Sequence, residues 1–142
     1  MKVLLAVDGS KGSLAAADWV LKHAAACREA PAVELVTVHL PVPRLPNMGK
    51  IVTKAQIESF YRDEGEEALA MAKKKLELGK IAFVPHILVG PVAETIVKHA
   101  RDARCDLICM GNRGMTELGQ MLLGSTATKV LHLSPKPVLL AK

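Results

Sequence analysis

The sequence predicts an α/β fold, a three-layer α/β/α sandwich in which helices cover both faces of a five-stranded parallel sheet. Short apolar runs alternate with longer segments of helical periodicity along the whole chain. The first run, residues 3–7, is apolar at every position, which is typical of a parallel strand buried on both faces. Right-handed crossovers and a third strand at the sheet edge favour the strand order 3-2-1-4-5.

A single domain is expected over residues 1–142, because this length and a hydrophobic content of 50% supply a core that needs no disulfide or metal. The three cysteines form no CxxC pair, and we interpret them as small buried residues of a reducing compartment: Cys27, Cys105 and Cys109. No apolar run is long enough for a signal peptide or a membrane span. The sequence therefore predicts a cytoplasmic protein without membrane insertion.

The first half of the chain begins with the strand at residues 3–7 and continues with a helix at about 13–29. Apolar residues of that helix recur at spacings of three and four: Leu14, Ala17, Leu21 and Ala24. A second strand is expected at 33–40. Three prolines and Gly49 then predict a surface loop over 41–49.

A long helix follows at about residues 53–78, with Gly79 as its stop. Its apolar positions predict one buried side: Ile57, Tyr61, Ala68, Ala72 and Leu76. Residues 81–89 are the third strand, and Pro85 within it predicts a place at the sheet edge, because proline cannot donate to a strand on each side.

The last part of the chain contains a helix from Pro91 to about residue 104, with the proline in its first turn. A fourth strand is predicted at 107–110 and a glycine-containing loop at 111–124. A helix at 125–133 and a strand at 138–141 complete the alternation.

Two polar segments, 8–10 and 111–114, follow the first and fourth strands. In an open parallel sheet, ligands bind beyond the carboxyl ends of the strands, where the strand order reverses. Here that point lies between these two strands. Closely spaced glycines and a helix that starts after Gly124 would direct backbone N–H groups at a phosphate. The hydroxyls of Ser125 and Thr126 either contact that phosphate or cap the helix.

Other classes of site lack their signatures. Residues 119–126 superficially resemble a Walker A loop, but Ser125 stands where the lysine is required. The chain has no GxGxxG after its first strand, no GxSxG, and no histidine pair at i, i+4, so we predict no catalytic and no metal-binding residues. The net charge of +5 suits an anionic partner or a lysine-rich surface, and an aromatic content of 3% argues against nucleic acid.

The spacing Gly111-x-x-Gly114, then nine residues, then Gly124-Ser125 resembles the GxxGx9G[ST] nucleotide motif of the universal stress protein family. The resemblance extends over nearly the whole chain, through segments similar to the family's strands: 3–10, 36–40, 106–111 and 137–140. It implies a Rossmann-like fold of the adenine nucleotide alpha hydrolase type.

The resemblance also implies a nucleotide site. In ATP-binding members, positions that match Asp8 and Leu40 hold the adenosine end. Positions that match the glycine motif hold the ribose and phosphates: Gly111, Gly114, Gly124 and Ser125, with Thr126 adjacent. The expected site is completed by neighbouring residues at the strand ends and in the loop: Ala6, Val7, Met110 and Arg113. From the residues alone, Asp8 is otherwise a turn or cap residue, and Arg113 otherwise a solvated loop residue.

The function that this resemblance implies is ATP binding, or AMP or ADP binding, with Mg²⁺, in a stress response or in signalling. Catalysis is expected to be at most slow ATP hydrolysis or self-phosphorylation. The family implies a homodimer formed through the last strand, Val138 to Ala141. The alternative is a dimeric interaction protein that regulates an unidentified partner, such as a transporter, without a nucleotide.

Overall fold

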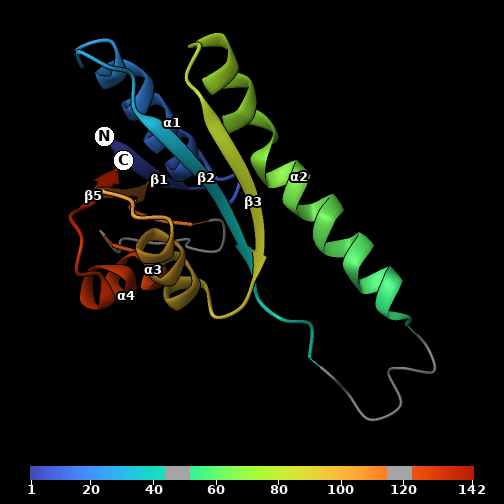
Figure 1. Cartoon of the computed structure of the whole chain (residues 1–142). Helices are drawn as coiled ribbons and strands as arrows, with labels where there is room; N and C mark the ends of the chain where they lie inside the picture. The colour runs from blue at the N-terminus through green and yellow to red at the C-terminus, as the bar shows by residue number, and fades with distance from the viewer. Residues whose placement is uncertain (44–51, 115–122) are drawn as a thin grey trace.

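A computed structural model of the chain describes residues 1–43, 52–114 and 123–142. All five strands are parallel and form one sheet in the order β3-β2-β1-β4-β5, which confirms the predicted fold class (Figure 1). The elements alternate along the chain: β1 (Lys2–Ala6), α1 (Lys11–Ala24), β2 (Ala32–His39), α2 (Lys54–Leu78), β3 (Phe83–Val89), α3 (Val92–Asp102), β4 (Leu107–Gly111), α4 (Ser125–Leu133) and β5 (Val138–Ala141).

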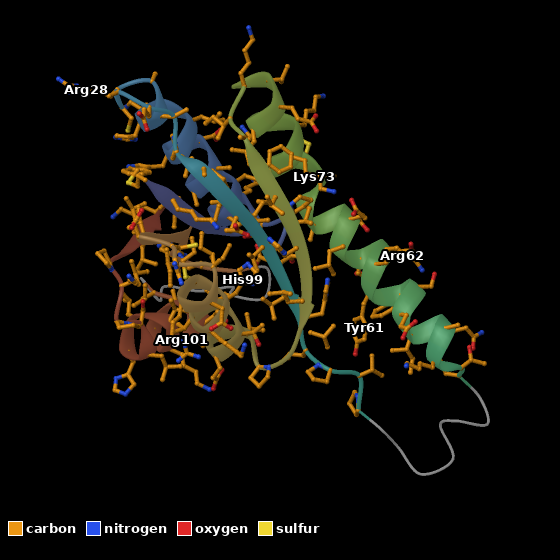
Figure 2. The ribbon with its side chains drawn as sticks, viewed as in Figure 1. Arg28, Tyr61, Arg62, Lys73, His99 and Arg101 are labelled. Atoms are coloured by element: carbon orange, nitrogen blue, oxygen red, sulfur yellow. The ribbon has the colours of Figure 1, made fainter. Side chains whose placement is uncertain are left out.

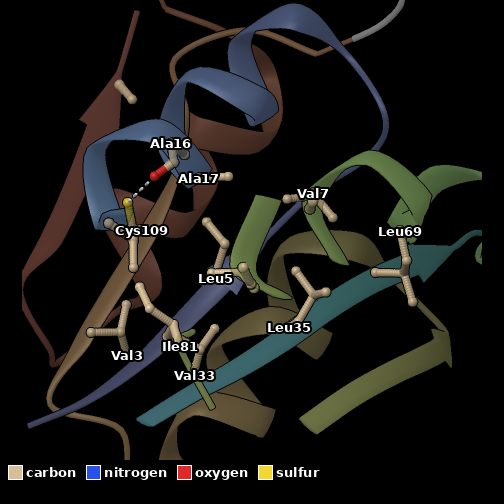
Figure 3. Packing of buried hydrophobic residues seen from close by; sticks show 14 residues of the cluster. Val3, Leu5, Val7, Ala16, Ala17, Val33, Leu35, Leu69, Ile81 and Cys109 are labelled. Carbon is tan, nitrogen blue, oxygen red and sulfur yellow. Dashed lines mark hydrogen bonds between the residues drawn. The ribbon is translucent and has the colours of Figure 1, made fainter. Parts of the chain in front are cut away.

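The core consists of two apolar layers, one on each face of the sheet. Val3, Leu5 and Leu35 pack with α1 and α2 on one face (Figure 3). Leu4 and Val36, which alternate with them along β1 and β2, pack with α3 and α4 on the other face. Both layers draw on every central strand, so residues 3–6 of β1 are all apolar and buried on both sides, after the half-buried Lys2.

Two of the three cysteines belong to this core, as predicted. Cys109 is fully buried beneath α1, where its Sγ lies 3.7 Å from the carbonyl oxygen of Ala16, and burial raises the pKa of its thiol to about 12 (Figure 3). Cys105 is also fully buried. The prediction was wrong for Cys27, which is exposed because it follows the end of α1, beyond the part of the helix that covers the sheet.

Helix α1 is shorter than predicted, starting at Lys11 and ending at Ala24 instead of spanning 13–29. Ser10 is its N-cap and accepts a hydrogen bond from the backbone N–H of Ser13 at 3.2 Å. The helix ends where burial ends, since residues 25–30 are all exposed. Of the predicted apolar side, Ala17 is buried, whereas Leu14, Leu21 and Ala24 are half-buried. Ala16 and Val20 lie deeper than those three.

Helix α2 has nearly the predicted bounds, and a capping box fixes its start. Gln56 N–H donates to Thr53 Oγ1 at 3.2 Å, while the Thr53 N–H donates to Gln56 Oε1 at 2.8 Å. Ala72 and Leu76 of the predicted apolar side are buried, together with Leu69. Of the loop predicted before this helix, residues 44–49 lie outside the described residues.

The remaining elements begin and end within two residues of their predicted bounds, and β3 is an edge strand, as Pro85 indicates. Across the described ranges, no helix combines the length and the apolar character that crossing a membrane would require.

Candidate functional site

A cleft of about 340 Å³ opens at the carboxyl ends of β1, β2 and β4, at the point where the strand order reverses. The structure brings together all the residues predicted for the site, each of which lines this cleft: Ala6, Val7, Asp8, Leu40, Met110, Gly111, Arg113, Gly114, Gly124, Ser125 and Thr126. Segments from both ends of the chain therefore meet at one place.

Asp8 shapes the turn between β1 and α1. Its Oδ1 accepts a hydrogen bond from the N–H of Ser10 at 2.9 Å, and Gly9 between them has a φ of +81°, which glycine adopts without strain. The turn role proposed for Asp8 is therefore real. The other carboxylate oxygen, Oδ2, faces Gly114 across the cleft, since a Cβ at Gly114 would lie 3.0 Å from it. Asp8 thus serves the turn and borders the cleft with one carboxylate.

Glycines at two places allow the start of α1 to lie directly against the end of β4. A Cβ on Gly111 would lie 2.5 Å from the carbonyl carbon of Gly12, and a Cβ on Gly12 would lie 2.8 Å from the carbonyl oxygen of Arg113. Backbone atoms cannot yield at such distances, so side chains are excluded from this contact. Gly111 therefore has a packing role, and the sequence reasoning missed Gly12.

The loop after β4 is anchored at both ends by backbone hydrogen bonds. The N–H of Asn112 donates to the carbonyl of Ala141 in β5 at 2.8 Å, and the N–H of Gly124 donates to the carbonyl of Asn112 at 2.7 Å. The second bond brings the two parts of the glycine motif together. Residues 115–122 of the spacer between them lie outside the described part of the chain.

The amino end of α4 borders the cleft through Gly124, Ser125 and Thr126. Gly124 is the N-cap, and no side chain caps the helix, so the proposal that Ser125 or Thr126 caps it was wrong. A helix start carries a partial positive charge and N–H groups without helical partners. This end of the cleft is therefore suited to an anion.

The opposite wall of the cleft is apolar and comes from β2 and α3. His39, the last residue of β2, also lines it, and its Nε2 is buried without a hydrogen-bond partner among the described residues. The chain leaving β2 is held by Tyr61 of α2, whose Oη accepts a hydrogen bond from the N–H of Val42 at 2.6 Å (Figure 2). The sequence reasoning missed His39, although its place beside Leu40 at a strand end was a usable signal.

These features define a class of protein: an α/β domain with a small-molecule cleft at the switch point of a parallel sheet, apolar on one side and bordered by glycine-containing backbone and a helix start on the other. Family comparison gives the particular assignment. The model of the universal stress protein family matches residues 1–142, so the chain belongs to this family.

Individual relatives agree with the family assignment. The chain is 34% identical to universal stress protein MJ0531 of Methanocaldococcus jannaschii, covering 99% of this chain and 81% of that protein. The solved structure of MJ0577 from the same organism superimposes with a TM-score of 0.77 at 32% identity, covering 99% and 94% of the two chains. An Arabidopsis thaliana family protein with AMP bound shares the fold, with a TM-score of 0.66 at 15% identity over 100% and 91% of the chains.

Proposed function

We propose that the cleft binds an adenine nucleotide, ATP with Mg²⁺ or its products AMP and ADP, and that the protein acts in a stress response or in signalling. The observation that carries this proposal is the meeting of the Asp8 turn, the end of β2 and the complete glycine motif in one cleft. The AMP bound to the Arabidopsis relative supports the same class of ligand.

The adenosine end is assigned to the wall formed by β2 and α3. The backbone at Leu40 offers an N–H and a carbonyl next to the apolar wall, which suits the edge of an adenine ring. His39 adds a buried ring nitrogen that lacks a described protein partner. The carboxylate of Asp8 is an acceptor for a ribose hydroxyl.

The phosphates are assigned to the end formed by the glycine motif and the start of α4. Gly111, Gly114 and Gly124 allow close approach of the backbone, and the helix start adds its positive end. Arg113 supplies a guanidinium that pairs with phosphate oxygens, and Ser125 a hydroxyl. Mg²⁺ bound here would take most of its ligands from the phosphates and water.

Hydrolysis is expected to be slow at most. Asp8 is the only carboxylate among the described residues that line the cleft, and its Oδ1 already accepts the turn hydrogen bond from Ser10. General acid–base catalysis needs a group that moves a proton at the reacting centre. Phosphate release from Mg²⁺-ATP is therefore expected to stay near the rate of buffer alone.

The proposal is tested by titration calorimetry of nucleotide-free protein with Mg²⁺-ATP, and by mass spectrometry of any ligand that copurifies. We expect saturable binding that weakens about tenfold in Arg113→Gln, while Arg62→Gln, on the exposed side of α2, leaves it unchanged. Gly124→Val is expected to abolish binding. No heat of binding at millimolar ATP would refute the proposal.

A homodimer through β5 is the second part of the proposal. β5 forms one edge of the sheet, and α4 beside it exposes Leu131 and Leu133, at 43% and 40% of their surfaces. If this surface alone carries the function, the protein acts as a nucleotide-independent dimer that binds another protein. Sedimentation equilibrium tests the dimer surface: Leu131→Glu with Leu133→Glu should give monomers, whereas Gly124→Val should remain dimeric. Binding of the partner protein by Gly124→Val as by the parent chain would favour the nucleotide-independent case.

A further inference from the structure

A second group of convergent polar side chains lies outside the cleft lining, on the face of the sheet that α3 covers. It consists of Glu34 from β2, His86 from β3 and His99 from α3. His99 lies between α3 and the strands in Figure 2. None of the three side chains lines the cleft; the nearest lining positions along the chain are Val36, two residues after Glu34, and Ile96, three residues before His99. The cluster is therefore separate from the proposed nucleotide site.

The three side chains converge on one point. His86 Nε2 lies 2.5 Å and His99 Nε2 lies 3.3 Å from the same carboxylate oxygen of Glu34, Oε2. The two rings have centroids 4.4 Å apart. The second oxygen, Oε1, pairs with the ammonium of Lys2 at 2.7 Å. The carboxylate thus presents one oxygen to the lysine and the other to both imidazoles.

We propose that Glu34, His86 and His99 form a binding site for a divalent transition metal ion of the Zn²⁺ class. Two imidazole nitrogens and one carboxylate oxygen are a ligand set that such ions favour. Ligands about 2.1 Å from a tetrahedral ion lie roughly 3.4 Å from one another. The three ligand atoms here all lie within 4.8 Å of one another, so small side-chain movements would complete the coordination.

The surroundings of the cluster favour a metal site with one open position. Its three ligands come from two paired strands and a helix packed on them, which hold their relative positions. Glu34 is 9% exposed, whereas His86 and His99 are 27% and 20% exposed, so water can reach the nitrogens and occupy a fourth position.

Metal binding has a defined proton balance. In the metal-free cluster, each Nε2 that donates to Oε2 carries its ring proton there. Coordination uses the Nε2 lone pair, so a neutral ring must carry its proton on Nδ1, while a charged ring releases the Nε2 proton to solvent. The ammonium of Lys2 remains on Oε1 and opposes the added positive charge, which limits the affinity.

The test is a Zn²⁺ titration of the full chain, free of nucleotide, in competition with a chromophoric chelator, with Co²⁺ absorption as a check on coordination. We expect one ion per chain and a rise in Tm with Zn²⁺. His86→Ala and His99→Ala should each weaken Zn²⁺ binding at least about tenfold. Loss of a residue that is hydrogen-bonded to a metal ligand already costs about tenfold or more in affinity, and loss of the ligand itself should cost no less. Both variants should fold, since both side chains are partly exposed.

Two control variants address the other candidates for zinc ligands. His132→Ala replaces an exposed histidine near the end of α4, and Cys27→Ser replaces the exposed thiol. Both should bind Zn²⁺ as the parent chain does, and the Co²⁺ spectrum should lack thiolate charge-transfer bands. The proposal is overturned if Zn²⁺ does not bind at submillimolar concentration, if His86→Ala with His99→Ala keeps the parent affinity, or if the loss follows Cys27→Ser.

Discussion

The cleft and the Glu34–His86–His99 cluster lie on the same sheet but are built from different kinds of structure. The cleft is made mainly from backbone at strand ends, where Gly12 and Gly111 let two elements touch. The cluster is made from side chains within regular elements, two strands and a helix, with no special backbone. The shape of the cleft therefore depends on the absence of side chains where α1 touches β4, whereas the cluster depends on which side chains it contains.

This difference predicts how each region fails. A side chain added at the cleft disturbs the packing of α1 on β4, so it costs stability as well as binding. A charge removed from the cluster leaves the backbone intact and changes the pH and metal dependence of the protein.

Gly111→Val should produce the largest effect. The new Cβ would lie 2.5 Å from the carbonyl carbon of Gly12 and 2.8 Å from the N–H nitrogen of Ser13, so the helix start must move. We expect a loss of about 3 kcal/mol in the free energy of unfolding in urea. Gly114→Val should lose less than about 1 kcal/mol, because among the described residues its Cβ meets a side-chain atom, Oδ2 of Asp8 at 3.0 Å, and no backbone atom. Equal losses in both variants would contradict the backbone contact.

Glu34 should make the cluster sensitive to acid. Burial favours the neutral carboxyl, but hydrogen bonds from Lys2, His99 and His86 outweigh it and lower the pKa of Glu34 from 4.5 to about 2. A lowered pKa in the folded state stabilises the protein above pH 4.5, and this stabilisation is lost as the pH falls towards 2. Between pH 5 and 3, the loss attributable to Glu34 is about 2 kcal/mol.

The measurement for Glu34 is urea unfolding at both pH values in the presence of a chelator, for the parent chain and Glu34→Gln. The parent should lose about 2 kcal/mol more than the variant, because the other carboxyls contribute equally to both. Glu58→Gln, on the exposed face of α2, should follow the parent. Parallel pH curves for the parent and Glu34→Gln would show that the ion pair is not maintained in solution.

Lys2 should act on the cluster through charge alone. Lys2→Met keeps the aliphatic chain but removes the ammonium that lies 2.7 Å from Glu34 Oε1. Because that ammonium repels a bound cation, the variant should bind Zn²⁺ at least about threefold more tightly. The matched control is Lys54→Met, whose ammonium pairs with Glu58 on α2. Weaker binding in Lys2→Met would mean that Lys2 positions the carboxylate instead of competing with the ion.

The cleft could be predicted from the sequence because its residues follow strand ends and form a spaced motif. Parallel strands bring their carboxyl ends to one edge, so Asp8 and Gly111 had to meet once the strand order was known. The bounds of α1 could not be predicted, since the apolar pattern does not show where the helix leaves the sheet. The position of His39 beside Leu40 at a strand end could be read from the sequence, but the burial of its Nε2 could not.

The cluster could not be predicted from sequence spacing. Its members are 52 and 65 positions apart from Glu34, and they meet only because β3 pairs with β2 and α3 crosses over both. A search for histidines at helical spacing finds ligands on one helix and overlooks those that tertiary packing brings together. The register of the strands, which places His86 opposite Val36, supplies the missing information.

The cysteines allow both regions to be followed without changing stability. Cys109 lies in β4 beneath α1, and burial raises its pKa to about 12; burial and then the charge of Glu34 also raise the pKa of Cys105. Cys27 is exposed.

In native buffer, one thiol per chain should react with a disulfide reagent, about a hundredfold or more faster than the others. Cys27→Ser should abolish this fast reaction. A second fast-reacting thiol would show that the structure opens locally, near the cleft if it is Cys109 or near the cluster if it is Cys105. Gly111→Val disturbs the contact of α1 with β4, so Cys109 should become more reactive in that variant, whereas Glu34→Gln leaves the backbone intact and should leave the buried Cys105 protected.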